Sequence, residues 1–266
     1  MTVIRASASA SSRRRPPAIP AVAAGYTRVL ETDFSQVSTL PAPWLAYNFA
    51  NGNASWGWYL GTHVFISGGV LHIDNSYEPS GPAPSTRLGY TTNGAGFYQG
   101  AITIDPTYRT TAYPYLSVNA RIQFAFKDVI TGGQYSHRNI PLRWPYNDAG
   151  TSLTSADGEE DVFESDGAPS TYTAFFHYSG GFVSASWSGL DIAPWHLYRM
   201  ERNGLNVTGS VDGVQLMSYS GTTTTLPSTY RLGPVFQQEF PHTGPNTGTT
   251  GSEDWQIAWI TIDVPA

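Results

Sequence analysis

From Tyr26 onward, apolar and polar residues alternate in short runs, the period expected of half-buried β-strands. The runs are GGVLHID (68–74), FYQGAITID (97–105), YLSVNARIQFAF (115–126), TYTAFFHYS (171–179), FVSASWS (182–188), LNVTGSVDGVQLMSY (205–219) and WQIAWITIDV (255–264). Gly, Pro, Asn and Asp separate them, and Val-Asp-Gly at 211–213 has the composition of a hairpin turn. Helical periodicity and internal repeats are both missing. This pattern predicts an all-β fold, a two-sheet jelly-roll sandwich over residues 26–266.

Residues 1–25 have a different composition, rich in Ala, Ser and Pro and containing four Arg but no acidic residue before position 16. The prolines would interrupt the apolar region of a signal peptide, so we expect a chain made in the cytoplasm without a cleaved signal. A segment of this composition cannot build its own core, and its prolines favour extended geometry. We therefore predict an extended N-terminal arm that leaves the domain and contacts another chain.

Composition limits the function classes. Only 13% of the 266 residues are charged while 14% are aromatic, a combination that suits sugar binding and equally suits a β-sandwich core. The chain has no Cys, which excludes disulfides and a Cys nucleophile. No run approaches the ~18 apolar residues of a membrane span, so we expect no membrane insertion. The net charge of −6, despite the basic arm, argues against nucleic-acid binding.

One stretch, DGEEDVFESD at 157–166, holds six of the 20 acidic residues of the chain. If it is a strand, Glu159 and Asp161 share one face, and Glu164 has the wrong parity for that face. A β-bulge at Val162–Phe163 would insert one residue and turn Glu164 back. Three carboxylates in line are what a retaining glycosidase can use, because its nucleophile and its acid/base lie about 5–5.5 Å apart.

The surrounding segments make this pattern specific. GEEDVFES resembles the signature G-E-I/L-D-I/V-x-E of glycoside hydrolase family 16, the laminarinase-like members of the concanavalin A-like lectin/glucanase superfamily. Similar segments occur in the family's order at WGWYLGTHVFISGGVLHID (56–74), ARIQF (120–124), LRWP (142–145), FFHYS (175–179), WHLYRMERNGLNVTGSVDGVQL (195–216), FQQE (236–239) and WQIAWITIDV (255–264). The resemblance spans residues 56–264 and implies a concanavalin A-like jelly roll.

The resemblance also implies roles for individual residues. Glu159 would be the nucleophile, Asp161 its assisting carboxylate and Glu164 the acid/base. Trp144 would be a sugar-stacking platform beside the cleft. Alternatively, Trp144 would be an ordinary core residue. His177 would be a polar cleft residue or, alternatively, a structural histidine.

Two further residues are candidates for substrate binding. Gln237 and Glu239 share parity on one strand and would hydrogen-bond sugar hydroxyls, unless they lie on an ordinary solvated face. No His/Asp cluster has metal-ligand spacing, so we expect neither a catalytic metal nor a cofactor. Members of the family often bind a structural Ca²⁺, to which the sequence assigns no residues.

The chain departs from the family at Glu160, where Ile or Leu is usual because the side chain points into the core. A buried unpaired carboxylate is expensive. Glu160 must then be partnered, or the rear face of the strand must be open, or the site has drifted. A shifted register that used Glu160 and Glu164 would put Val162 where the aspartate belongs, and we disfavour it.

The sequence predicts a retaining endo-glycosidase-like domain that acts on or binds a β-linked cell-surface polysaccharide. A catalytically decayed glycan-binding module and a purely structural protein are the alternatives. The basic arm and the glycan-active fold together suggest a minor tail protein of a bacteriophage virion, one that meets the host cell wall. Its expected partners are a polysaccharide and, through residues 1–25, other virion proteins.

Overall fold

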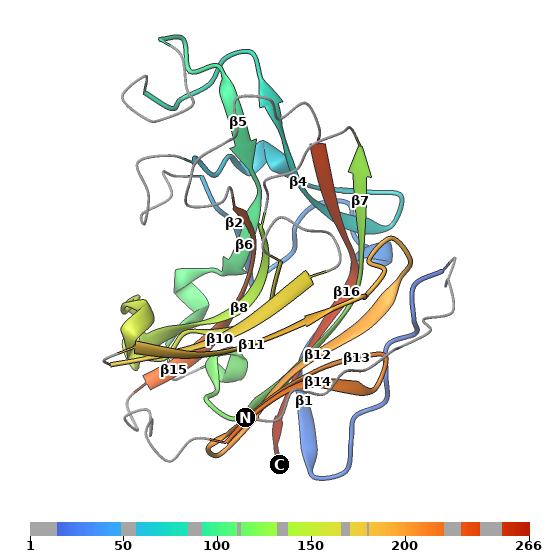
Figure 1. The fold of residues 1–266 in the computed structure, drawn as a ribbon, viewed down its shortest axis with the longest axis vertical. Coiled ribbons are helices and arrows are strands. Elements are labelled where there is room, and N and C mark those ends of the chain that lie inside the picture. The colour runs from blue at the N-terminus through green and yellow to red at the C-terminus, as the bar shows by residue number, and fades with distance from the viewer. Residues whose placement is uncertain are drawn as a thin grey trace.

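The protein forms two antiparallel β-sheets packed face to face, as predicted (Figure 1). The computed structural model describes residues 15–48, 57–84, 92–110, 113–131, 138–165, 171–179, 181–220, 230–239 and 252–266, with the side chains of 138–140, 165, 230 and 239 excepted. Within these ranges the only helical segments are 3₁₀ turns of three residues each. No described helix is long and apolar enough to cross a bilayer.

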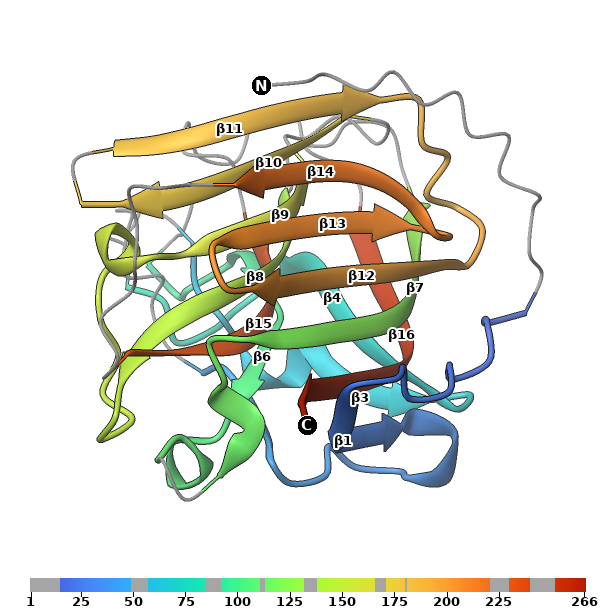
Figure 2. The ribbon, with the colours of Figure 1, turned by 90° about the horizontal axis from the view of Figure 1, so that it is seen from below.

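The larger sheet has nine strands within the described residues and runs in the order β14-β13-β12-β7-β16-β4-β3, with β1 paired to β16 and β5 paired to β4. Its strands are β1 (Tyr26–Asp33), β3 (Val64–Ser67), β4 (Val70–Glu78), β5 (Gly96–Gln99), β7 (Ala120–Thr131), β12 (His196–Asn203), β13 (Asn206–Val211), β14 (Val214–Ser220) and β16 (Ser252–Pro265). In Figure 2 the blue β1 lies beside the red C-terminal end of β16, its partner strand.

The smaller sheet has seven strands in the same described ranges, in the order β11-β10-β9-β8-β15-β6-β2. Its strands are β2 (Trp44–Ala46), β6 (Ala101–Ile104), β8 (Arg138–Asn147), β9 (Glu160–Ser165), β10 (Thr171–Tyr178), β11 (Gly181–Ser188) and β15 (Tyr230–Glu239). Residues 160–165 of the acidic stretch thus form β9, third from one edge of the sheet, with neighbours on both sides.

Aromatic side chains join the two sheets. Phe163 of β9 packs edge-on against Tyr198 of β12, with ring centroids 5.0 Å apart, and Phe236 of β15 meets Phe124 of β7 in the same way at 5.0 Å. Pairs of this geometry contribute about 0.5–1.5 kcal/mol each beyond the burial of their surface. Because the apolar face of β9 is held in this core, its other face must point away from the larger sheet.

The described part of the arm lies against its own domain. Pro17 is buried, and its carbonyl accepts a 2.7 Å hydrogen bond from the indole N–H of Trp259 in β16. A buried indole N–H needs an acceptor, and residues 15–25 supply one. The expectation that residues 1–25 leave the domain is therefore corrected for 15–25, while residues 1–14 lie outside the described residues.

A glycine makes room for β9 in the opposing sheet. A Cβ atom on Gly209 of β13 would lie 2.5 Å from Val162 Cγ1 and 3.2 Å from Phe163 Cζ. We expect Gly209→Ala to lower the free energy of unfolding by about 1–3 kcal/mol, because these core side chains must move. Urea unfolding measures the loss. Gly61→Ala is the control, since the nearest atom to its added Cβ would be 3.8 Å away; equal stability of the two variants would contradict this packing.

Candidate active site

The register between β9 and β10 contains the predicted bulge. Asp161 pairs with Phe175 and Glu164 pairs with Thr173. Two residues of β9, Val162–Phe163, therefore lie opposite a single residue of β10. The bulge inferred from the need to align three carboxylates is confirmed.

The bulge puts Asp161 and Glu164 on the same face of the sheet. Directly paired residues of an antiparallel ladder point to the same side. Their partners Phe175 and Thr173 are half-buried and alternate along β10 with buried residues of the core. Asp161 and Glu164 consequently face away from the core, although neighbouring groups leave them only 4% and 6% exposed.

Glu159 precedes β9 and joins the same group. Its carbonyl oxygen accepts a 2.9 Å hydrogen bond from the backbone N–H of His177, which continues the outward-facing series of β10. His177 Nε2 lies 3.1 Å from Asp161 Oδ2 and 3.9 Å from Glu159 Oε2. The structure therefore brings His177 together with the predicted carboxylates, in a place where it can orient Asp161.

The same three side chains are close enough to hold a metal ion. Ligand atoms of Glu159, Asp161 and His177 all lie within 4.8 Å of one another, the one such group in the part of the chain that the structure describes. Carboxylate and imidazole are ligands for ions such as Zn²⁺. An ion bound there would occupy carboxylate oxygens of Glu159 and Asp161, the predicted nucleophile and its assisting carboxylate.

Glu160, the residue that departs from the family pattern, is buried and paired. It is 1% exposed, and its carboxylate lies between two arginines. Arg143 Nη1 of β8 donates to Glu160 Oε2 at 3.0 Å, and Arg202 Nη1 of β12 donates to Glu160 Oε1. The carboxylate thus bridges the two sheets through their interior, and of the three explanations considered for Glu160 the structure selects the partnered one.

The Arg143 guanidinium depends on these neighbours. It is fully buried, and burial lowers its pKa while the charge of Glu160 raises it. Arginine is not deprotonated in proteins, so the group keeps its charge. Its Nη2 also donates to the carbonyls of Ser117 at 2.7 Å and Val118 at 2.8 Å. Glu160 is therefore part of the structure of the core and does not belong to the outward-facing group.

Trp144 and Gln237 lie on the carboxylate face of neighbouring strands. Leu142 of β8 pairs with Asp161, and Trp144 follows it on the same face, half-buried, with its indole N–H donating to Ser152 Oγ at 2.7 Å. Gln237 of β15 is two residues beyond the partner of Leu142 and shares that face.

Glu239 occupies the next position of the same parity on β15, as predicted. The conformation of its side chain lies outside the described residues. Both β15 candidates are two strands away from β9, with β8 between them.

Two phenylalanines beside the site, Phe175 and Phe182, were not among the residues predicted from the sequence. Phe182 of β11 is 55% exposed, and its ring centroid lies 5.4 Å from that of Phe175 and 5.7 Å from that of His177. Phe182 pairs directly with His177, so all three share the carboxylate face. Phe175 and His177 share parity within FFHYS, and the register of the hairpin then puts Phe182 opposite His177.

No family model and no curated protein sequence matches this chain. Solved structures do. SCLam, a non-specific endo-β-1,3(4)-glucanase from family GH16, superposes with a TM-score of 0.68 at 16% identity over 95% of each chain. The fold is the jelly-roll sandwich of glycoside hydrolase family 16.

Two more of these structures extend the comparison. The catalytic domain of an endo-1,3-β-glucanase (laminarinase) from Thermotoga petrophila RKU-1 gives a TM-score of 0.66 at 14% identity, covering 90% of this chain and 98% of its own. A LamA variant from Z. galactanivorans, in complex with laminaritriose and laminaritetraose, gives 0.66 at 15% identity, covering 89% and 98%. The structural neighbours are glycoside hydrolases that share the whole sandwich with this chain.

Proposed function

We propose that this protein is a retaining endo-glycosidase that hydrolyses a β-linked polysaccharide of the β-1,3-glucan class. The observation that carries the proposal is the bulge of β9, which returns Glu164 to the face of Asp161 although their spacing in the sequence would separate them. The family resemblance of the sequence and the endo-glucanase fold of the solved neighbours point to the same chemistry.

In the proposed mechanism, Glu159 attacks the anomeric carbon while Glu164 protonates the glycosidic oxygen of the leaving sugar. A covalent glycosyl-Glu159 intermediate forms, and Glu164 then deprotonates the water that releases it. Asp161, between the two, orients the nucleophile. His177, 3.1 Å from Asp161, holds that carboxylate in turn.

The aromatic residues of the same face give the substrate its apolar contacts. Trp144 lies on the β8 side of β9, and Phe175 and Phe182 lie on the β10 and β11 side. Aromatic rings can pack against the apolar faces of sugar rings on both sides of the bond to be cleaved. Sugar-binding surface on both sides of the reacting bond is what an endo-acting enzyme requires.

The pairing of Glu160 favours hydrolysis over a decayed binding module. An unpaired Glu160 would have pulled β9 out of register or into solvent. With two arginines around it, the residue stays in the core and Glu159 keeps the outward position. The setting on a bacteriophage virion is a separate proposal, which rests on the composition of the arm, and residues 1–14 are its candidate anchor.

The stereochemistry of the first product tests the mechanism. Laminarin is incubated with the protein, and the anomers of the new reducing ends are followed by ¹H NMR before mutarotation. We expect the β-anomer first, because two displacements at one carbon restore the original configuration. Appearance of the α-anomer first would replace the proposed mechanism by an inverting one. Oligosaccharide binding without any cleavage of β-1,3- or mixed-linkage glucan would support the binding module instead.

A further inference from the structure

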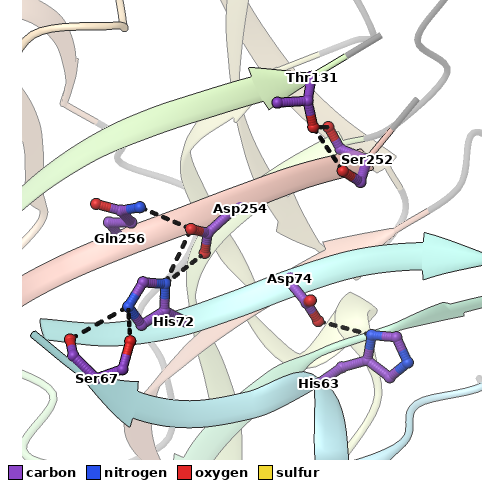
Figure 3. Close-up of polar contacts among 8 residues, drawn as sticks. All are labelled: His63, Ser67, His72, Asp74, Thr131, Ser252, Asp254 and Gln256. Carbon is purple, nitrogen blue, oxygen red and sulfur yellow. Dashed lines mark hydrogen bonds and ion pairs between the residues drawn. The ribbon is translucent and has the colours of Figure 1, made fainter.

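A second constellation of reactive side chains lies on the larger sheet, at the opposite side of the sandwich from β9. Ser67 ends β3, His72 lies in β4, and Asp254 comes from the distant β16. His72 alternates with the core residues Leu71 and Ile73, so it belongs to the outer face of this sheet. Figure 3 shows the three side chains meeting around the imidazole ring.

The contacts are those of a serine nucleophile with its base and orienting acid. Ser67 Oγ lies 2.9 Å from His72 Nε2, and both carboxylate oxygens of Asp254 lie 2.9 Å from His72 Nδ1. The Nδ1–H tautomer that Asp254 selects directs the Nε2 lone pair toward Ser67, whose Oγ is the nearer contact and whose backbone carbonyl oxygen lies 3.3 Å from the same nitrogen. Gln256 Nε2 donates to Asp254 Oδ2 at 2.6 Å and fixes the carboxylate in place.

The charge of Asp254 also tunes the base. Partial burial lowers the pKa of His72. The hydrogen bond to Asp254 and the negative charge of that carboxylate raise the pKa by more than burial lowers it, so the net shift is upward. A more basic imidazole takes a proton from a serine more readily. The constellation therefore combines geometry and basicity.

We propose that Ser67, His72 and Asp254 form a second catalytic site, an acyl-transfer site that hydrolyses short-chain carboxylic esters. The proposal is independent of the glycosidase, because it uses other residues on the other sheet.

The turn after Ser67 supplies the donors that such a site needs. Gly68 and Gly69 connect β3 to β4 with φ angles of 57° and 79°. Among the described residues neither of their backbone amides donates a hydrogen bond. The amide that follows a nucleophilic serine is a common oxyanion donor, and a Cβ on Gly68 would meet nothing within 4 Å. A carbonyl oxygen can therefore approach this turn.

An exposed aromatic ring sets the size of the acyl group. Phe65 is 42% exposed and stacks on His72 with centroids 4.6 Å apart and ring planes 4° from parallel. This ring is an apolar wall beside Ser67, which is itself exposed. A wall of one ring suits an acyl group of a few carbons, such as acetyl, better than a long chain.

The reaction balances with ester and water alone. Ser67 Oγ bonds to the ester carbonyl carbon as His72 Nε2 takes the hydroxyl proton, and the carbonyl π electrons move to oxygen. The tetrahedral intermediate collapses, the C–O bond to the alcohol breaks, and His72 returns the proton to the leaving alcohol. Water then attacks acyl-Ser67 with the same base and releases the acid.

The other polar groups of Figure 3 do not combine a serine, a histidine and a carboxylate. His63 Nδ1 lies 2.6 Å from Asp74 Oδ1 with no serine in the group, and Ser252 Oγ lies 2.7 Å from Thr131 Oγ1 with no histidine. Ser252 is therefore a matched control, a hydroxyl of the same sheet without a base.

Labelling with a fluorophosphonate tests the proposal on the full chain. Intact mass and peptide mapping should show one phosphonyl group per chain, on Ser67, and p-nitrophenyl acetate should be hydrolysed. Ser67→Ala should lose the label and the hydrolysis, and Asp254→Asn should slow both. Ser252→Ala and the glycosidase variant Glu159→Gln should keep both.

The outcomes separate the two proposals. Lack of a label on Ser67 in the folded wild-type protein, or equal ester hydrolysis by wild type and Ser67→Ala, overturns the acyl-transfer site. If Glu159→Gln loses glucan hydrolysis but Ser67 is still labelled, the acyl-transfer site is supported as a separate site. If the wild-type chain cleaves no glucan yet labels at Ser67, the glycosidase fails and the esterase remains.

Discussion

Glu159→Gln is expected to lower the rate of glucan hydrolysis by several orders of magnitude while leaving the protein folded. The amide keeps the shape of the side chain but cannot form the glycosyl ester, so only the nucleophilic step is lost. The measurement is the initial rate of reducing-end release from laminarin, together with the midpoint of urea unfolding for each variant.

Glu31→Gln is the matched control, since Glu31 is 49% exposed in β1 and far from β9 in the fold. It should keep the wild-type rate. Asp161→Asn should lie between the two, because Asp161 orients the nucleophile and does not react. A Glu159→Gln variant that hydrolyses glucan as fast as wild type would contradict the nucleophilic role of Glu159. If Glu164→Gln alone loses activity, another residue must be the nucleophile.

Glu160→Ala is expected to cost about 3–5 kcal/mol of the free energy of unfolding, far more than an ordinary acidic substitution. The change leaves Arg143 and Arg202, which are 0% and 2% exposed, as neighbouring buried cations without their shared carboxylate. Uncompensated buried charge is among the largest penalties that a single substitution causes. Urea or thermal unfolding, analysed as a two-state transition, measures it.

Two variants sharpen this test. Glu31→Ala also removes an ion pair with an arginine, but an exposed one, and should cost about 0–1 kcal/mol. The triple change Arg143→Met, Glu160→Leu, Arg202→Met removes all three charges and should recover most of the stability. If Glu160→Ala loses no more stability than Glu31→Ala, the two arginines do not hold Glu160 in the core. The pairing of Glu160 would then no longer explain why Glu159 faces outward.

Local pattern predicted the class of fold and part of its elements. Alternation located β4, β5, β6, β10, β11, β13, β14 and β16 to within a few residues, but β1, β2, β3, β8, β12 and β15 are not among the alternating runs. Asp212 and Gly213, with φ angles of 49° and 81°, form the predicted hairpin turn. The bulge was inferable because chemistry supplied a constraint that alternation lacks: the three carboxylates are useful only on one face. What lies within one strand or one turn could be deduced from adjacent residues.

Contacts between distant strands were not predictable in the same way. The two arginines around Glu160 come from β8 and β12, and Asp254 lies 182 positions from His72. Such pairs depend on the order of strands in each sheet and on how the sheets face each other, which alternation does not encode. The arm was mispredicted over 15–25 for the same reason, because the acceptor that Trp259 needed is evident only in the folded chain.

The bulge of β9 also governs how this chain can be aligned and re-engineered. Side chains of a strand alternate between its two faces, and the pair Val162–Phe163 inserts one extra residue into that alternation. Any comparison or graft that matches residues one for one across that pair assigns Glu164 to the interior and exchanges the two surfaces of everything after it. Transfers of this strand between sandwiches should therefore be indexed by cross-strand partners, with Asp161 on Phe175 and Glu164 on Thr173, rather than by position along the chain.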